Sequence, residues 1–70
     1  MSSTSSLTPK DIVRILKKKG FVLDRSRGSH QVWLHPVSRK RAVVPMHNKD
    51  IPIGTLYAIL KQAGIDKEEL

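Results

Sequence analysis

The side chains of this sequence best suited to acid–base chemistry near neutral pH are three histidines: His30, His35 and His47. His30 directly follows Gly28 and Ser29. Two arginines, Arg25 and Arg27, come just before that glycine. A turn at the glycine would let the backbone approach a ligand and would bring two guanidinium groups and an imidazole together. A neutral imidazole beside cations can act as a general base, and the alternative is that His30 hydrogen-bonds its own turn or packs partly over a sheet.

The three histidines do not have the arrangement of a zinc site. His30 and His35 fall on one expected strand, where residues five apart point to opposite faces of a sheet. The sequence also has no phosphate-binding loop, no paired glycines of the dinucleotide-binding type and no carboxylate cluster suited to magnesium. We therefore expect neither a metal nor a small-molecule cofactor.

A second cationic group, formed by Arg39, Lys40 and Arg41, lies in and beside an expected hairpin loop. A loop that projects three cations suits contacts to phosphates, although a merely solvated loop fits the pattern as well. Trp33 also has two interpretations, because an indole can stack on a nucleic-acid base or belong to the core. Strand alternation places Trp33 on the face opposite His30, which does not favour a shared site.

The charge balance of the chain points to a polyanionic partner. The 70 residues hold 13 Lys and Arg against 6 Asp and Glu, which gives a formal charge of +7, and three of those acids lie in the last five residues. Such a field favours a polyanion, most often a nucleic acid. An excess of lysine on an ordinary soluble surface is the alternative.

Length and cysteine content exclude several classes of protein. A chain of this length builds one modest core, which excludes a two-domain enzyme with a cleft between its lobes. The absence of cysteine excludes a disulfide framework and a thiolate zinc site, and it suits a reducing cytoplasm. No apolar run approaches the roughly 20 residues of a membrane helix, and no signal peptide follows Met1. We expect a cytoplasmic domain over residues 7–70 with a disordered tail over residues 1–6.

The first element expected to position these residues is a helix. Thr8 is a suitable N-cap, and Pro9 fits the first helical position. Gly20 supplies a left-handed residue after the last turn. These signals predict a helix from about Pro9 to Lys19, with an apolar stripe on one side.

A sheet and a second helix are expected to follow. Runs of strand character cover residues 21–26, 30–35 and 41–45. The second helix should open at Pro52 and end at Gly64, since apolar residues recur there at the spacing of one buried face: Leu56, Ile59, Leu60 and Ala63. The expected fold is α+β, in the order α-β-β-β-α, with a three-stranded antiparallel sheet covered on one face by two helices. The other face and the turns remain for function.

Four segments carry a resemblance to a known family. They are KDIVRILKKKGFVL, RGSHQVWLHP, VVP and DIPIGTLYAILKQAGI, and together they resemble the HicA family of toxin ribonucleases over nearly all of residues 9–65. The most specific pieces are the triplet Gly28-Ser29-His30, the pair His35-Pro36 and the run from Ile51 to Leu56 that leads into the second helix.

The resemblance implies a fold like that of the double-stranded-RNA-binding domain, whose α-β-β-β-α order agrees with the order expected from the residues. It also implies the toxin of a type II toxin–antitoxin system, a metal-independent endoribonuclease that cuts messenger RNA and inhibits translation. His30 would be the catalytic residue, and a HicB-like antitoxin would neutralise the protein. The second helix lacks the lysine-rich start of ordinary duplex binders, which weakens any expectation of duplex binding.

These features support a mechanism in which His30 deprotonates a ribose 2′-OH that attacks the adjacent phosphorus, while nearby cations hold the phosphate. Because DNA lacks this hydroxyl, the substrate would be RNA. The candidates for a general acid are His35, His47 and the lysines. Two alternatives are a non-catalytic RNA-binding module and an interaction protein whose basic surface meets an acidic partner. The residues expected to contact RNA are Arg25, Arg27, Gly28, Ser29, Arg39, Lys40 and Arg41.

Overall fold

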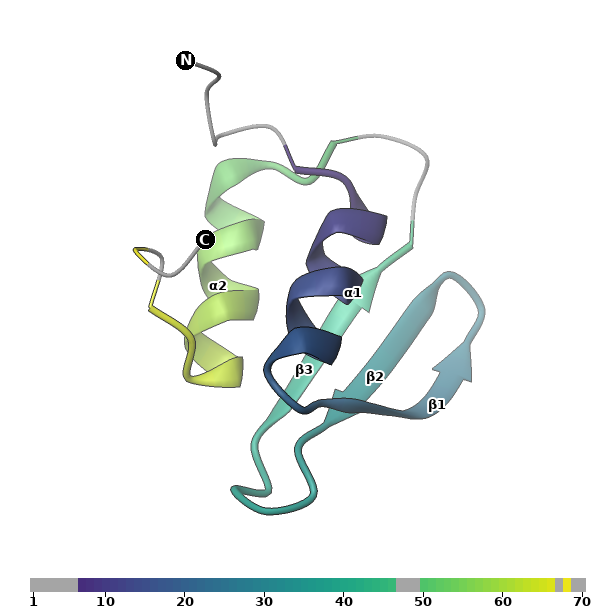
Figure 1. Ribbon diagram of the computed structural model, residues 1–70. Coiled ribbons are helices and arrows are strands. Elements are labelled where there is room, and N and C mark those ends of the chain that lie inside the picture. The colour runs from purple at the N-terminus through teal and green to yellow at the C-terminus, as the bar shows by residue number, and fades with distance from the viewer. Residues whose placement is uncertain (1–6, 47–49, 67, 69–70) are drawn as a thin grey trace.

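The computed structural model describes residues 7–46, 50–66 and 68 of the chain. The tail expected over residues 1–6 and the candidate general acid His47 lie outside the described residues. The expected α+β fold with the order α-β-β-β-α is confirmed (Figure 1). Its elements are α1 (Pro9–Lys18), β1 (Val22–Arg27), β2 (His30–Leu34), β3 (Arg41–Pro45) and α2 (Ile53–Ala63).

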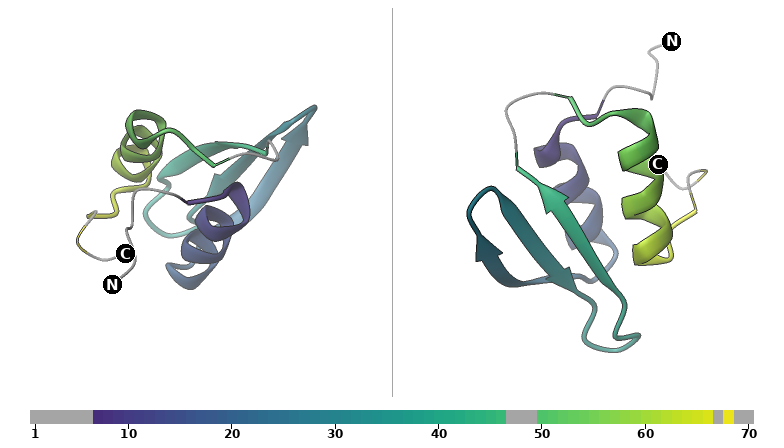
Figure 2. Two further views of the ribbon diagram at one scale, coloured as in Figure 1. Left: turned by 90° about the horizontal axis from the view of Figure 1, so that it is seen from above. Right: turned by 180° about the vertical axis from the view of Figure 1, so that it is seen from behind.

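The three strands form one antiparallel sheet in the order β1-β2-β3. Both helices pack against β3 on the same side of the sheet, and the hairpin of β1 and β2 projects beyond them (Figure 1 and Figure 2). Every residue of β1 is exposed as a result. The sheet therefore has a covered face, which meets the helices, and an open face, as the sequence predicted.

The hydrophobic core lies between the helices and the covered face of the sheet. Trp33 belongs to this core, since it is only 4% exposed, and its indole N–H donates to the side-chain oxygen of Gln31 at 3.2 Å. Of its two interpretations, the structure supports a core residue and not a surface for base stacking. The apolar face predicted for the second helix is buried here as expected: Leu56, Ile59, Leu60 and Ala63.

Helix α1 begins with a reciprocal cap between two side chains. The Thr8 hydroxyl accepts a hydrogen bond from the Asp11 N–H at 3.3 Å, and the Asp11 carboxylate accepts one from the Thr8 N–H at 3.0 Å. The bond from the Thr8 N–H is the main reason why the pKa of Asp11 lies below its ordinary value of 3.8. The predicted N-cap is therefore confirmed.

The link between α1 and β1 shifts both elements by one residue from their predicted bounds. Helix α1 ends at Lys18, and Gly20 follows with a φ of +96°. This left-handed residue lets the Phe21 N–H donate to the Leu16 carbonyl at 2.9 Å. Because that N–H completes the helix cap, it does not join the sheet, and β1 begins at Val22.

Helix α2 is anchored at both of its ends. Just before it, the Ile51 N–H donates to the Leu7 carbonyl at 2.7 Å, which ties the approach to α2 to the approach to α1. Just after it, the Ile65 N–H donates to the Leu60 carbonyl at 2.9 Å, and Gly64 takes the left-handed conformation predicted for the helix end. The Leu7–Ile51 bridge thus joins the starts of the two helices, which lie side by side on one face of the sheet (Figure 1).

Candidate active site

A β-bulge in β1 decides where the two arginines of this strand lie. Asp24 is an extra residue, because its neighbours Leu23 and Arg25 are opposite consecutive residues of β2. If β1 ran through Asp24 without a bulge, strand alternation would place Arg25 and Arg27 beside Leu23 on the covered face. The bulge instead brings both arginines to the open face, where the side chain of His30 lies.

His30 stands directly opposite Arg27 at the end of the hairpin. Side chains opposite each other on antiparallel strands have their Cβ atoms about 5 Å apart. Both residues are exposed, and β1 reaches Arg27, one residue beyond its predicted end. The structure therefore places an imidazole beside a guanidinium on the last rung of the sheet before the turn.

The turn next to this pair consists of Gly28 and Ser29. Gly28 has a φ of +55°, which a side chain would strain, and no other described part of the chain comes within 4 Å of where its Cβ would be. On the inner side, the Ser29 carbonyl accepts a hydrogen bond from the Met46 N–H just after β3. The turn is thus anchored to the sheet and leaves open space for the close approach of a ligand backbone.

Arg25 lies two rungs further along the strand, on the same open face, and interacts with the bulge residue. Its Nε donates to the Asp24 carboxylate at 3.3 Å, in an ion pair exposed enough to add little net stability. A phosphate approaching the open face can compete for this guanidinium. Sequence reasoning did not identify Asp24 as a residue that shapes the site, and the strand sequence VLDRSR has no Gly or Pro to signal the bulge.

The middle of the open face is aliphatic. Val43 is 37% exposed there, and Arg41 lies beyond it on the rung shared with Leu34. That rung is four residues from His30, roughly 13 Å along the strand. The open face thus has cations at both ends and an apolar area between them, formed by Val22, Val32, Leu34 and Val43.

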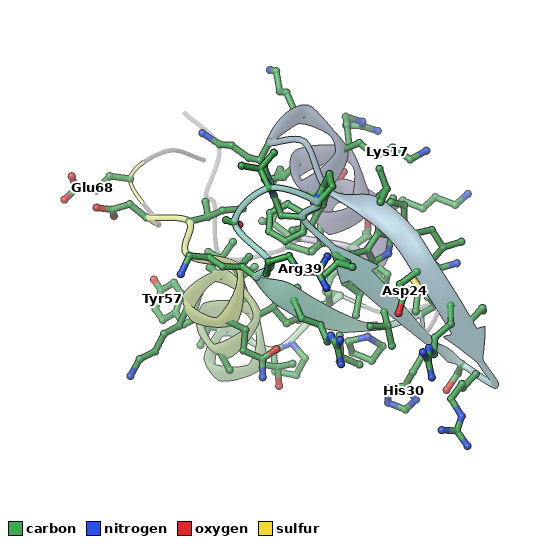
Figure 3. The ribbon with its side chains drawn as sticks, turned by 90° about the horizontal axis from the view of Figure 1, so that it is seen from below. Lys17, Asp24, His30, Arg39, Tyr57 and Glu68 are labelled. Carbon is green, nitrogen blue, oxygen red and sulfur yellow. The ribbon has the colours of Figure 1, made fainter. Side chains whose placement is uncertain are left out.

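The loop that carries Arg39 and Lys40 lies at the end of the sheet away from His30 (Figure 3). Arg39 takes a left-handed conformation with a φ of +66°, and its N–H donates to the His35 carbonyl at 2.9 Å. The Lys40 side chain runs along the end of α2, since a Cβ on Gly64 would come within 2.7 Å of Lys40 Cδ. The structure therefore divides the residues expected to contact RNA into two groups, of which only one surrounds His30.

His35 holds this far loop in shape. Its Nδ1 accepts hydrogen bonds from two backbone N–H groups of the loop, at 3.2 and 3.1 Å. The ring meets Phe21 edge-on at a centroid distance of 5.2 Å. His35 follows His30 by five residues, roughly 17 Å along an extended chain. The structure does not bring this candidate general acid to His30.

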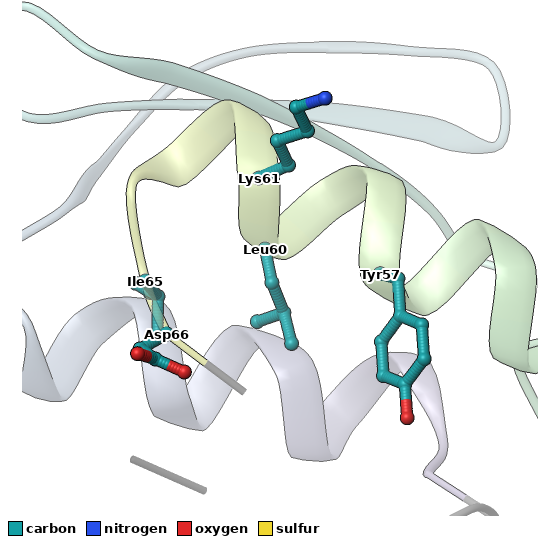
Figure 4. Close-up of a pocket in the computed structure, with 5 residues that line it drawn as sticks. All are labelled: Tyr57, Leu60, Lys61, Ile65 and Asp66. Carbon is teal, nitrogen blue, oxygen red and sulfur yellow. The ribbon is translucent and has the colours of Figure 1, made fainter. Parts of the chain in front are cut away.

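Other features of the described residues lie away from the His30 site. Those residues include no group of three or more His, Cys, Asp or Glu that could hold a metal ion. A hollow of about 280 Å³ occurs on α2 and the segment after it (Figure 4). No residue that lines it belongs to the open sheet face; the lining consists of Tyr57, Leu60, Lys61, Ile65 and Asp66.

The fold and this site define a small basic α+β domain that exposes an imidazole and arginines on one face of its sheet. Residues 9–65 match a family described as the HicA toxin of bacterial toxin–antitoxin systems. The match covers most of the chain, which therefore belongs to the HicA toxin family. No curated protein matches the sequence. Neither helix that the structure describes has the length and apolar character needed to cross a membrane.

Proposed function

We propose that the protein is a toxin that acts as an endoribonuclease, cuts messenger RNA and so inhibits translation in the cytoplasm. The observation that carries this proposal is the rung formed by Arg27 and His30 on an exposed sheet face. An imidazole lies there beside a cation, next to a turn with open space at Gly28, and an imidazole can act as a general base. Membership of the toxin family supports the physiological role.

The proposed reaction uses the 2′-hydroxyl of the RNA itself as the nucleophile. His30 takes the proton of this hydroxyl, and the 2′-oxygen bonds to the adjacent phosphorus. The bond from that phosphorus to the 5′-oxygen of the next nucleotide breaks, and the departing oxygen takes a proton from water. DNA has no hydroxyl at this position and would not be cut.

The arginines would act on the phosphate rather than on the hydroxyl. Arg27, across the rung from His30, is placed to bind the non-bridging oxygens and to stabilise the negative charge that develops on them. Arg25 would add a second positive charge once its contact with Asp24 is exchanged for the phosphate. In this scheme protein side chains and water supply every group that acts on the RNA, so we expect cleavage to persist in the presence of a chelator.

The partner implied by the family is an antitoxin, and we infer that a HicB-like protein inhibits cleavage by covering the open face. The aliphatic area between the two cationic ends suits a protein surface that carries acidic groups around an apolar centre. Such a partner would bury His30 and the turn together. Titration of the antitoxin into a cleavage reaction should therefore abolish activity at an equimolar ratio.

The direct test is cleavage of a long RNA by purified protein in the presence of a chelator. The wild type is expected to cut, and His30→Ala is expected to be inactive while keeping the circular dichroism spectrum of a folded domain. Arg27→Gln should lower the rate, and Lys61→Gln, which removes one exposed positive charge from α2, is the matched control. Cleavage that survives His30→Ala would reject the mechanism. Tight, salt-sensitive RNA binding without any cleavage would favour the non-catalytic RNA-binding module instead.

A further inference from the structure

Helix α1 carries a cluster of positive charge that the proposed reaction does not use. We call these four exposed residues the α1 stripe: Lys10, Arg14, Lys17 and Lys18. Three of them recur at i, i+4 and i+7, so they form a line roughly 10 Å long on the side of the helix opposite the buried Ile12 and Leu16.

Helix stability accounts for only part of this stripe. Lys17 and Lys18 lie in the last turn, where a positive charge is favoured by the helix dipole. Lys10 lies in the first turn, where the same dipole disfavours it. Arg14 reaches Asp11 only at 3.6 Å, and its side chain is 77% exposed. The contrast with α2 is clear, because Lys61 is the one charged residue among its 11.

The single acid of α1 does little to balance this charge. Asp11 is the N3 residue of the cap, and its carboxylate accepts hydrogen bonds from the N–H and the hydroxyl of Thr8, both at 3.0 Å. These bonds hold it at the start of the helix, beside the first turn. The remainder of the outer face therefore presents lysine and arginine to solvent.

The composition of the stripe indicates the kind of ligand that fits it. The large apolar side chains of α1 face the core, where Ile12 and Leu16 are fully buried. A protein interface uses apolar or aromatic anchors, and a membrane-surface helix uses an exposed apolar side, but the stripe offers neither. A row of exposed cations that offers no exposed apolar anchor suits the phosphate backbone of a nucleic acid.

The stripe lies on the other side of the sheet from the candidate active site. Lys17 Nζ stands 5.9 Å from the ring centroid of Trp33, which faces the covered side. His30 projects from the open side, so the two labelled side chains lie apart in Figure 3. One RNA chain can contact both by passing around the exposed edge formed by β1.

We propose that the α1 stripe is a second RNA-binding site, which holds the phosphate backbone of the substrate away from the bond that is cut. The inference rests on the proposed function for the identity of the ligand as RNA. The stripe serves affinity for long RNA, whereas the rung of Arg27 and His30 serves the chemistry. An RNA long enough to pass around β1 occupies both sites, and a short one occupies the open face alone.

The test measures RNA binding in the His30→Ala background, so that the RNA stays intact. Fluorescence anisotropy compares labelled oligonucleotides of about 4 and about 16 nucleotides, the span of single-strand site sizes in small domains. The main variant is Lys10→Gln/Arg14→Gln/Lys17→Gln, since glutamine preserves helix propensity. A matched pair of single changes, Arg14→Gln and Lys61→Gln, removes one exposed charge from each helix. Circular dichroism confirms folding of each variant.

The expected results follow from counterion release. Each lost phosphate contact should flatten the dependence of log affinity on log salt by about 0.7, or about 2 for three contacts. At 0.1 M salt the same relation gives about a fivefold loss for Arg14→Gln and on the order of 100-fold for the triple variant on the long RNA. The loss on the short RNA should be much smaller, and Lys61→Gln should have less than about a twofold effect.

Three results would overturn the second site: an unchanged salt dependence, equal losses for Arg14→Gln and Lys61→Gln, or equal losses on short and long RNA. Failure of the proposed function is seen separately, as absent cleavage by the wild type. If the wild type binds long RNA through the stripe without cutting it, the second site stands and the nuclease proposal falls. If the wild type cuts RNA and the triple variant binds long RNA as tightly as the His30→Ala protein, the nuclease proposal stands and the second site falls.

Discussion

The two cationic surfaces of this domain differ in what surrounds their charges. On the open sheet face, His30 and the arginines border an aliphatic area that includes the partly exposed Val43. On α1, the charges form a line whose apolar neighbours are turned into the core. A surface of the first kind can bind a phosphate and also a folded protein partner, whereas a surface of the second kind is suited to a polyanion alone. In the arrangement we propose, the open face serves cleavage and antitoxin recognition, and α1 holds the RNA away from the cut.

The largest effect that would sharpen this contrast is expected from His30→Ala. Loss of one general base should lower the single-turnover cleavage rate by about 10²- to 10⁴-fold. The Kd for long RNA should change little, because the imidazole is expected to act on the hydroxyl and not on the backbone charge. Rapid-quench kinetics at saturating enzyme separate the two quantities. A variant whose loss lies mainly in Kd would show that His30 binds RNA and does not act on its hydroxyl.

The next largest effect is expected on antitoxin affinity, which should fall for a change on the open face and not for a change on α1. Val43→Glu places a charge in the aliphatic area. We expect it to lower the affinity for the cognate antitoxin by about tenfold or more. Val37→Glu is the matched control, since Val37 is 82% exposed in the far loop and lies outside that area. Lys10→Glu should likewise leave antitoxin affinity nearly unchanged. Isothermal titration calorimetry provides the measurement, and similar losses for Val43→Glu and Val37→Glu would contradict the proposed docking face.

The contribution of α1 to stability can be separated from its contribution to RNA binding. Thr8→Ala removes the cap hydroxyl and should lower the free energy of unfolding by about 1 kcal/mol. For a domain of this size, that corresponds to a fall in Tm of about 4–8 °C. Arg14→Gln should show the opposite pattern, with nearly unchanged Tm and weaker RNA binding. If Thr8→Ala weakened RNA binding at a temperature where it is fully folded, the stripe would not act through charge alone.

The smallest expected effect is a pH dependence that arises at the start of α1. Hydrogen bonds, first of all from the Thr8 N–H, hold the pKa of Asp11 below its ordinary value of 3.8. The ionised carboxylate is thus favoured in the folded state, and its contribution is fully present above that ordinary value. It is lost as the pH falls through the lower pKa of the folded state. Urea unfolding of Asp11→Asn and the wild type should therefore show a stability difference at about pH 7 that shrinks at about pH 3.

The helices could be predicted because the signals that form them are local. Thr8, Pro9 and Gly20 lie next to the ends that they define, and the buried face of α2 follows from the spacing of its apolar residues. The hairpin carrying Gly28 could be predicted for the same reason, and so could the meeting of Arg27 with His30 across it. Local chemistry fixes these features, so sequence neighbours suffice to reveal them.

The remaining features of the site depend on how distant segments meet. The bulge at Asp24 results from the register between β1 and β2, and no residue of the strand marks it. Arg39, Lys40 and Arg41 are neighbours in the sequence, yet Lys40 lies along the end of α2 whereas Arg41 lies on the open face. In the sequence, the helix dipole alone explains the lysines at the end of α1. Nothing in the sequence therefore required them to be grouped with Lys10 and Arg14 in one stripe.

The bulge at Asp24 also bears on how the protein behaves at high concentration. Strand β1 is an edge of the sheet, and the backbone groups along such an edge can pair with a strand of another molecule. A bulge breaks the flat geometry that this pairing needs, and Arg25 and Arg27 would place like charges close together if two copies of β1 approached. The residues that shape the candidate active site therefore also protect the protein from edge-to-edge aggregation. A version with a flat, uncharged β1 should lose solubility before it loses its fold.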